Sequence, residues 1–432
     1  MKSLRHYTML AIAFVVTSYP LAVVSKAAAR VWNALLPVNV EHSFNGALTL
    51  TSLIPTIYNA MDIVSREQTG FIRAVGRDSG AERAAKGETI MSPVVGAMAA
   101  EELNVGAYPA DTPAQTIGNV SMTISKTRSV PFGITGEETR GLQNAGTLGQ
   151  VNRDRITQAL RTLSNEIEAD LAALHIAASR AHGGTATGTP FNTAADLSDF
   201  ANCKRVLEEN GAPASDQHMV LDSASVGRLR GKQSSLFKVN EAGSDELLRT
   251  GSMGTVQGFD LHWSPAVKTL VTVGTVSATV DATGYAVGDK VLTMSAAASA
   301  LLVGDIVTFA GDANQYVIAA ISGASQNAGT ITIAEPGLKI AMSAATKAVT
   351  VIAATTRNMF FHRGAIQLIT RAPAMPEGGD SADDVVIVTD PVSGIAFEFA
   401  LYRQKRQLRY EVNLAWGVKM VAPRHSGLLI GA

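Results

Sequence analysis

The side chains best suited to bind a metal ion are two histidines in one predicted helix. His175 and His182 lie seven residues apart, about two helical turns, so their imidazoles are expected to face the same way. A carboxylate at Glu168 or Asp170 falls nearby. A metal site is one interpretation of this group. Packed or solvated side chains are the other, and the sequence favours it, because the eight histidines are otherwise scattered and no H-E-x-x-H motif occurs.

Nucleophilic chemistry has equally little support. The single cysteine, Cys203, can form neither an intramolecular disulfide nor a cysteine-rich metal site, and a lone thiol is more often a small buried side chain than a nucleophile. No Walker-type phosphate loop, no G-x-G-x-x-G after a strand and no G-x-S-x-G motif occurs. The sequence therefore predicts no catalytic residue, no cofactor and no metal, and we do not expect an enzyme.

Three further groups of charged or polar residues could have a functional interpretation. Gly-Asp dipeptides occur at 288–289, 304–305 and 311–312. They lack the clustered acidic ligands of calcium loops, so we interpret them as ordinary turns. The adjacent acids Glu137–Glu138 and Asp383–Asp384 point apart on a helix or a strand, and we interpret them as solvated charge or contacts between subunits. Lys86 and Asn104 form a conceivable crosslinking pair, which the sequence does not favour.

Composition limits the remaining classes of protein. The 432 residues suffice for two or three domains, and 46% hydrophobic residues allow a sizeable core. Only 17% are charged, below the roughly 25% of typical soluble domains, so other subunits can cover much of the surface. The net charge is -1 and the pI about 6.7, whereas sequence-reading DNA-binding domains usually exceed a pI of about 9. Any contact with nucleic acid is expected to be non-specific.

The N-terminus allows two interpretations. Residues 1–29 resemble a secretory signal, with Lys2 and Arg5 before an apolar run and a small-residue cleavage site at 27–29. Alternatively, residues 1–46 are an upstream extension that the folded protein does not need. We favour the second interpretation, because a different and recognisable beginning follows near residue 47.

Two patterns organise the rest of the chain. Apolar residues recur every three or four positions through 152–182, which predicts a long helix of roughly 45 Å that ends at Gly183-Gly184. A shorter helix is predicted at 52–66, and 76–119 is predicted to be an irregular Gly- and Pro-rich loop.

From about residue 269 the pattern changes to short Val, Ile and Thr runs between glycine turns, which is typical of a small β-barrel or sandwich. After 356, two long half-buried strands are predicted at 395–402 and 408–416. A β-domain inserted into a larger α+β domain is the simplest account of this order.

Three segments in this order resemble one protein family. Leu50-Thr51-Ser52-Leu53-Ile54-Pro55-Thr56-Ile57-Tyr58 is similar to an opening common in phage coat proteins. Gly304-Asp305-Ile306-Val307-Thr308-Phe309-Ala310-Gly311 resembles a strand and turn of the insertion domain in the coat proteins of Salmonella-type podoviruses (gene-five type). Arg357-Asn358-Met359-Phe360-Phe361-His362-Arg363-Gly364-Ala365 resembles the strand at which such proteins re-enter the core. The resemblance covers about 48–432.

The resemblance implies the Hong Kong 97 capsid fold, an α+β fold, with an inserted small all-β barrel. It implies an N-terminal arm at 47–82, an extended loop at 83–122, a capsid core with peripheral and axial domains at 123–268 and 356–432, a spine helix at 152–182, and the barrel at 269–355. The arm and loop are expected to take their shape by lying on neighbouring subunits.

The function implied is that of a non-catalytic major capsid protein of a tailed bacteriophage or prophage. Expected partners are many copies of itself, scaffolding and portal proteins, and packaged double-stranded DNA in non-specific proximity. The expected location is the virion capsid, assembled in the bacterial cytoplasm, with no membrane contact in the mature form. The alternative is a secreted β-rich surface protein or adhesin, which depends on the leader being genuine.

Overall fold

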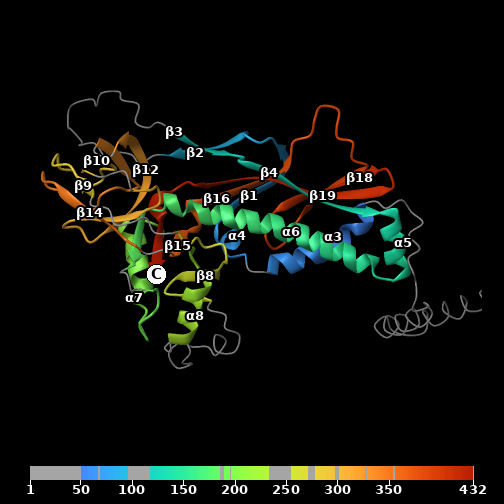
Figure 1. The fold of residues 1–432 in the computed structure, drawn as a ribbon, viewed down its shortest axis with the longest axis horizontal. Helices are drawn as coiled ribbons and strands as arrows, with labels where there is room; N and C mark the ends of the chain where they lie inside the picture. The colour runs from blue at the N-terminus through green and yellow to red at the C-terminus, as the bar shows by residue number, and fades with distance from the viewer. Residues whose placement is uncertain are drawn as a thin grey trace, which may run out of the picture. The chain divides into compact units, whose positions relative to one another are not determined.

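A computed structural model describes ten stretches of the chain: 50–66, 69–95, 117–184, 189–194, 196–232, 254–270, 278–296, 301–325, 328–353 and 356–431. The expected leader or extension at 1–46 lies outside them, as does Asn104. The described residues form a mixed α+β fold with two large sheets (Figure 1).

The first sheet, called here the long sheet, has six strands built around β19 (Gln407–Met420). Along β19 run β18 (Ala396–Gln404) and, with ten paired positions, β4 (Lys126–Thr135). The remaining strands are β1 (Gly76–Ala84), β16 (Ile366–Pro373) and β17 (Asp384–Thr389). Strands form where the sequence predicted them, but the prediction that they are half-buried is wrong: Ala396–Leu401 of β18 and Val412–Gly417 of β19 are buried without a break, because α3 and α6 on one side and neighbouring segments on the other cover both faces.

The helix α6 (Leu148–Ala173) lies along the long sheet (Figure 1). Its predicted apolar stripe is buried, but the prediction that the helix continues to residue 182 is wrong. A 3₁₀ turn at Leu174–Ala177 follows α6, and β5 (Arg180–Gly183) then pairs with two other strands. The backbone bonds of those pairings replace the helical ones, so a 26-residue helix of roughly 39 Å remains.

Helices α3 (Leu50–Arg66) and α4 (Gly70–Ala74) pack against α6. Their apolar side chains belong to the same core as the α6 stripe: Leu50, Leu53, Ile57, Ala60, Met61, Val64, Phe71 and Ile72 are buried. The expectation that the arm takes its shape on neighbouring subunits is therefore wrong for these residues. Helical periodicity in 50–64 already supplied an apolar face wide enough to pack on the chain's own core.

The segment predicted to be an irregular loop also contains regular structure. Within 76–119, β1 runs parallel to β16, and β2 (Thr89–Val95) pairs with β3 (Ile117–Thr123). β1 was missed because it carries polar side chains on both faces, which removes the alternation used to recognise a strand. β2 was missed because Pro93 interrupts its short apolar run.

The second sheet joins β5, β20 (Ser426–Gly431), β15 (Thr356–His362), β6 (Gln217–Leu221), β8 (Phe259–Trp263) and β7 (Thr255–Val256) in that order. We call it the mixed sheet, because β5–β20 and β6–β8 are parallel pairs. Helices α7 (Ser198–Glu209) and α8 (Ser223–Lys232) share a second apolar core with it.

Six further strands close into a barrel with its own core. In order around the barrel they are β9 (Ala278–Val280), β10 (Val291–Ala296), β13 (Ala328–Ile333), β12 (Gln315–Ser325), β11 (Ile306–Phe309) and β14 (Lys347–Val351). The chain enters and leaves side by side, because Thr269 bridges to Thr356 and Arg357 N donates to Lys268 O at 3.0 Å. β12 also pairs with β5, which attaches the barrel to the mixed sheet.

If α3 is part of the chain's own core, truncating its buried face must destabilise the isolated chain. We expect Ile57→Ala, at a fully buried position, to lower the free energy of unfolding by roughly 2–4 kcal/mol in chemical denaturation. The matched control is Tyr58→Ala, at a neighbouring side chain that is 45% exposed, which should change it by less than about 1 kcal/mol. Equal effects of the two substitutions would contradict the assignment.

Candidate assembly site

The strands β2 and β3 form an antiparallel ribbon, called here the ribbon, with seven paired positions from Thr89↔Thr123 to Val95↔Ile117. Within the described residues the two strands pair only with each other (Figure 1). Met91 on the ribbon is 65% exposed, an unusual position for a large apolar side chain. Met122 of the ribbon is buried against the long sheet, and Lys419 Nζ donates to Ser121 O at 2.6 Å, so the uncovered apolar surface is on the side of Met91.

The base of the ribbon is fixed to the long sheet. Gly87 N donates to Ile124 O and Ile124 N donates to Glu88 O, both at 2.9 Å, and Ile124 is buried beside Ile369 and Ala415. Gly417 permits this approach, since a Cβ there would lie 2.2 Å from the carbonyl oxygen of Thr123. The ribbon is thus a projection with a rigid base.

A buried carboxylate connects α6, α4 and the end of β8. Glu168 on α6 accepts hydrogen bonds from Phe71 N at 3.1 Å and Ile72 N at 2.8 Å, the first turn of α4. It also accepts one from Ser264 Oγ at 2.7 Å, just after β8. Burial raises the pKa of Glu168, while the backbone and hydroxyl donors act in the opposite direction. The sequence analysis considered Glu168 only as a possible metal ligand. Its spacing of four residues from Ser164 and eight from the apolar Leu160 was the available signal that it faces the core.

The mixed sheet holds a pair of histidines that the sequence analysis missed. His218 Nδ1 on β6 and His262 Nε2 on β8 are 3.1 Å apart, a hydrogen-bond distance at which one ring donates and the other accepts. Asp216 Oδ1 lies 3.0 Å from His218 Nε2. Burial, followed by the neighbouring His218, lowers the pKa of His262 to about 4. Nothing in the sequence spacing of residues 218 and 262 indicates this contact, because it depends on strands β6 and β8 being parallel neighbours.

The histidines proposed for a metal site do not meet. His175 is buried in the 3₁₀ turn, with Nδ1 3.0 Å from Ala172 O, whereas His182 lies on β5 near Asp199. Asp170 instead accepts hydrogen bonds from Lys126 and from Trp416 Nε1. Among the described residues, no group of three or more His, Cys, Asp or Glu side chains is placed to hold a metal ion.

The other candidate residues have structural surroundings. Cys203 is buried in the core shared with α7, as predicted, and burial raises the pKa of its thiol. The Gly-Asp dipeptides are turns, in which Asp289, Asp305 and Asp312 accept hydrogen bonds from backbone N–H groups two or three residues away.

Glu138, Asp383 and Asp384, from the two adjacent acid pairs, make contacts within the chain at the starts of two helices and at a β-hairpin. Glu138 and Thr135 form a reciprocal capping box at the N-terminus of α5 (Gly136–Asn144). Asp384 accepts a hydrogen bond from Leu50 N at 2.8 Å, at the start of α3. Asp383 pairs with Arg403 at 3.1 Å. Lys86 lies in the turn before the ribbon.

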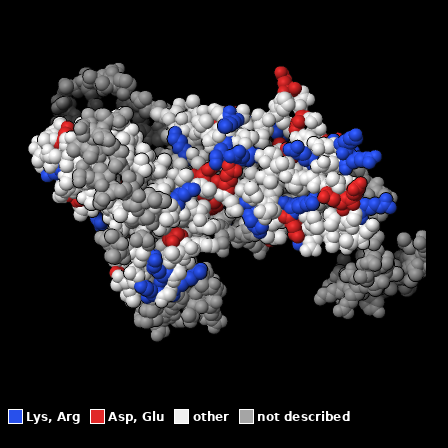
Figure 2. Space-filling model, in the orientation of Figure 1, with Lys and Arg blue, Asp and Glu red and all other residues white. Residues whose placement is uncertain are grey.

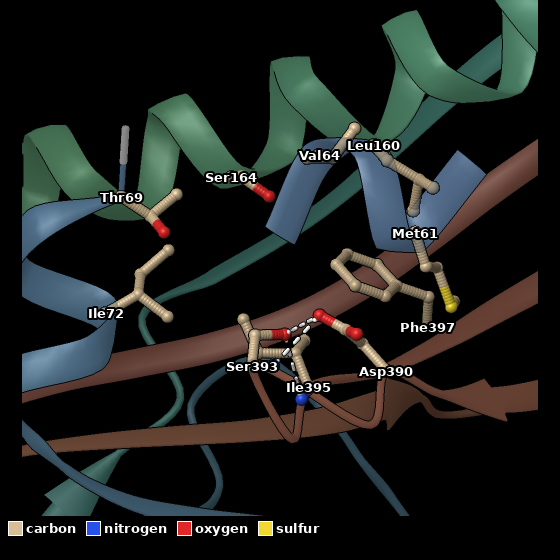
Figure 3. Close-up of a pocket in the computed structure, with 10 residues that line it drawn as sticks. All are labelled: Met61, Val64, Thr69, Ile72, Leu160, Ser164, Asp390, Ser393, Ile395 and Phe397. Atoms are coloured by element: carbon tan, nitrogen blue, oxygen red, sulfur yellow. Dashed lines mark hydrogen bonds between the residues drawn. The ribbon is translucent and has the colours of Figure 1, made fainter. Parts of the chain in front are cut away.

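A small hollow lies between α3, α6 and the turn after β17, lined by Met61, Leu160 and Phe397 among others (Figure 3). Its volume of about 10 Å³ is room for roughly one water molecule. Asp390 at its edge accepts from Val392 N at 3.1 Å and from both Ser393 N, at 3.0 Å, and Ser393 Oγ. This Asp–Ser contact therefore closes a turn.

No protein-family model and no curated protein matches the sequence. Several solved structures are similar to the chain. One is described as Mycobacterium phage Che8, with a TM-score of 0.45 and 15% identity over 84% of this chain and 91% of that chain. A second is the capsid of the cyanophage P-SCSP1u, with a TM-score of 0.41 and 10% identity over 93% and 94%. A third is a virus-like particle from Pyrococcus furiosus, with a TM-score of 0.40 and 8% identity over 87% and 98%.

In the described part of the chain, no helix is long and apolar enough to cross a membrane.

The Glu168 junction gives a prediction for stability. Glu168→Gln retains the shape but turns an amide N–H₂ towards N–H donors, so we expect a loss of roughly 2–3 kcal/mol in the free energy of unfolding, measured by denaturant titration. Glu166→Gln, two residues earlier on α6 and in a partly exposed ion pair with Lys126 and Arg128, is the control and should cost less than about 1 kcal/mol. A harmless Glu168→Gln would show that the junction contributes little.

The histidine pair gives a pH dependence. The folded chain resists protonating His262 until about pH 4, whereas an unfolded histidine accepts a proton near pH 6.5. Protons therefore favour the unfolded chain in this window, and stability is lost as the pH falls from 7 to 4, by roughly 2 kcal/mol from this group. We expect His262→Gln to flatten the curve of unfolding free energy against pH. An unchanged slope would refute this role.

Proposed function

We propose that this chain is the major capsid protein of a tailed bacteriophage or prophage. In this proposal, copies of the chain associate into an icosahedral shell around the phage DNA and catalyse no reaction. The observation that carries the proposal is the exposed ribbon, whose strands pair only with each other in the described part of the chain.

A lone two-stranded ribbon is marginally stable in water, so it gains from a surface on which to pack. A neighbouring copy offers such a surface. Burial of apolar ribbon atoms such as those of Met91 contributes about 25 cal/mol per Å², less the entropy of ordering the side chains. One such contact is weak, but a subunit in a closed shell makes several at once, and linked contacts reinforce one another.

The rest of the described fold is packed tightly enough to act as a stiff subunit. α6 crosses the long sheet and shares one apolar core with α3, α4 and strands of both sheets. Packed cores are stiff, so strain at the ribbon base is transmitted through the long sheet to α6. We infer that the packed core keeps the subunit rigid, while the ribbon that projects from it makes contacts with other subunits.

The partners in this proposal are many copies of the same chain, with scaffolding and portal proteins during assembly in the bacterial cytoplasm. A net charge of -1 fits non-specific proximity to packaged double-stranded DNA, because tight binding would need a strongly basic surface. The mature protein would reside in the virion capsid.

Removing the ribbon tests the proposal directly. Residues 91–121 can be replaced by a short Gly-Ser linker, because this keeps the base hydrogen bonds of Glu88 and Ile124 and also the paired residues Ile90 and Met122, which pack on the long sheet. We expect a chain that folds, with an unchanged cooperative melting transition, but forms no particles in sedimentation or negative-stain microscopy.

The control is Met91→Ser in the full chain, which keeps the ribbon and removes only apolar surface. It should assemble at a higher protein concentration than the unmodified chain. Normal particles from the chain whose ribbon is replaced by the linker would contradict the proposal.

A further inference from the structure

An open groove lies between α5 and the turn that joins β18 to β19. Its volume is about 1070 Å³, and the basic side chains on its walls are Arg140, Arg403, Lys405 and Arg406, with Glu137 as the acidic one. Figure 2 shows Lys and Arg side chains gathered at this end, where Figure 1 places α5 and β18, with smaller acidic areas among them. We call this feature the basic groove.

Three of these cations have no ion-pair partner among the described residues. Within the described residues, Arg140, Lys405 and Arg406 make no ion pair, whereas Arg403 pairs with Asp383 at 3.1 Å. The groove therefore keeps unneutralised positive charge on an exposed wall. Unpaired like charges close together repel one another, so they are a cost to the isolated chain.

The backbone conformation of Arg406 is a second, independent sign that this residue is a cost to the isolated chain. Gln404 pairs with Gln407, which leaves Lys405 and Arg406 as a two-residue turn. Arg406 has a φ of +58°, the left-handed region that glycine and asparagine adopt most readily. Its carbonyl accepts a hydrogen bond from Gly136 N at 3.1 Å, which fixes the turn against α5. An arginine at this position opposes the turn's own stability, which points to a role for its side chain outside the subunit.

The complementary charge lies elsewhere on the same chain. Between Arg371 and Arg403 the sequence contains no Lys or Arg but six acids. Five of the six have a partner within the chain: Asp380, Asp383, Asp384, Asp390 and Glu398. Glu377 is the sixth, and it lies with Asp380 in the exposed stretch 376–381 between β16 and β17, called here the acidic loop.

The acidic loop stands out from the long sheet, with acidic atoms at its tip (Figures 1 and 2). Gly378 and Gly379, at φ values of +97° and +90°, shape its turn. Asp380 accepts a hydrogen bond from Tyr402 Oη, which holds one side of the loop, whereas Glu377 has no hydrogen bond or ion pair within the described residues. A projecting loop with acid at its tip has the shape and charge that the basic groove would accept.

We propose that the acidic loop of one copy docks in the basic groove of a second copy. The inference rests on the self-association in the proposed function and names one contact within it. Groove and loop are different surfaces, so the contact is head-to-tail and propagates around a ring. A short acidic loop suits the groove better than DNA does, because Glu137 lies on its wall and only a few cations are gathered there.

The test uses the full chain and charge reversal on both sides. Arg406→Glu and Glu377→Arg, each alone, should raise the protein concentration needed for assembly roughly tenfold at low salt, measured by sedimentation velocity. The double variant restores the attraction with its sign inverted and should return assembly close to that of the unmodified chain. Added salt should weaken assembly of the unmodified chain and of the double variant alike.

Arg406→Gly separates this contact from the turn itself. It relieves the left-handed strain, so the melting temperature should rise or stay the same, while assembly weakens because the charge is gone. Assembly unaffected by both single reversals, or a double variant no better than the singles, overturns the contact but leaves the shell proposal standing. An unmodified chain that never associates overturns both. A groove that instead binds a double-stranded DNA oligonucleotide, with Arg406→Glu abolishing only that binding, overturns the loop as its occupant.

Discussion

The buried carboxylate of Glu168 holds together the two halves of the described fold. It projects from α6, which lies on the long sheet, and accepts hydrogen bonds from the first turn of α4 and from Ser264 at the end of β8 in the mixed sheet. A buried acid is costly unless every lone pair is used, so its donors must stay in place. These short bonds, together with the apolar core that strands of both sheets share, connect the long sheet to the mixed sheet.

The barrel, the mixed sheet and the ribbon differ in how much of their strand edges is left unpaired. The barrel has none, because β11 pairs with both β12 and β14 and closes the ring. The mixed sheet ends on β7, which is only two residues long. The ribbon is the opposite case, with seven-residue strands that pair with no third strand within the described chain. Since unpaired edges invite pairing with other chains, the proposed association would favour the ribbon over the barrel.

Sequence patterns predicted elements whose burial follows a regular period. The apolar stripe of α6 is an example, because one buried face determines it. The strands β18 and β19 were located by their alternating pattern, but their burial on both faces was not predicted. Elements set by non-local pairing were missed: β5 carries a helical continuation pattern, yet its Arg180 pairs with Tyr316 and Gly427. The arm was misjudged because the sequence shows an apolar face but not what covers it. The roles of Glu168, His262 and Arg406 depend on neighbours 40 to 270 residues away, which no local pattern encodes.

Weak surface contacts have a physical advantage in a closed assembly. An exposed ion pair contributes only about 0–1 kcal/mol, so a loop in a groove cannot by itself hold two subunits together. In the proposed assembly each subunit would take part twice, once with its acidic loop and once with its basic groove, and the ribbon would add a separate contact. A wrongly placed copy satisfies few of these and dissociates, while a correctly placed copy satisfies all of them at once. Keeping each contact weak and the body rigid therefore makes the geometry of the subunit, rather than the strength of any one bond, decide which assembly survives.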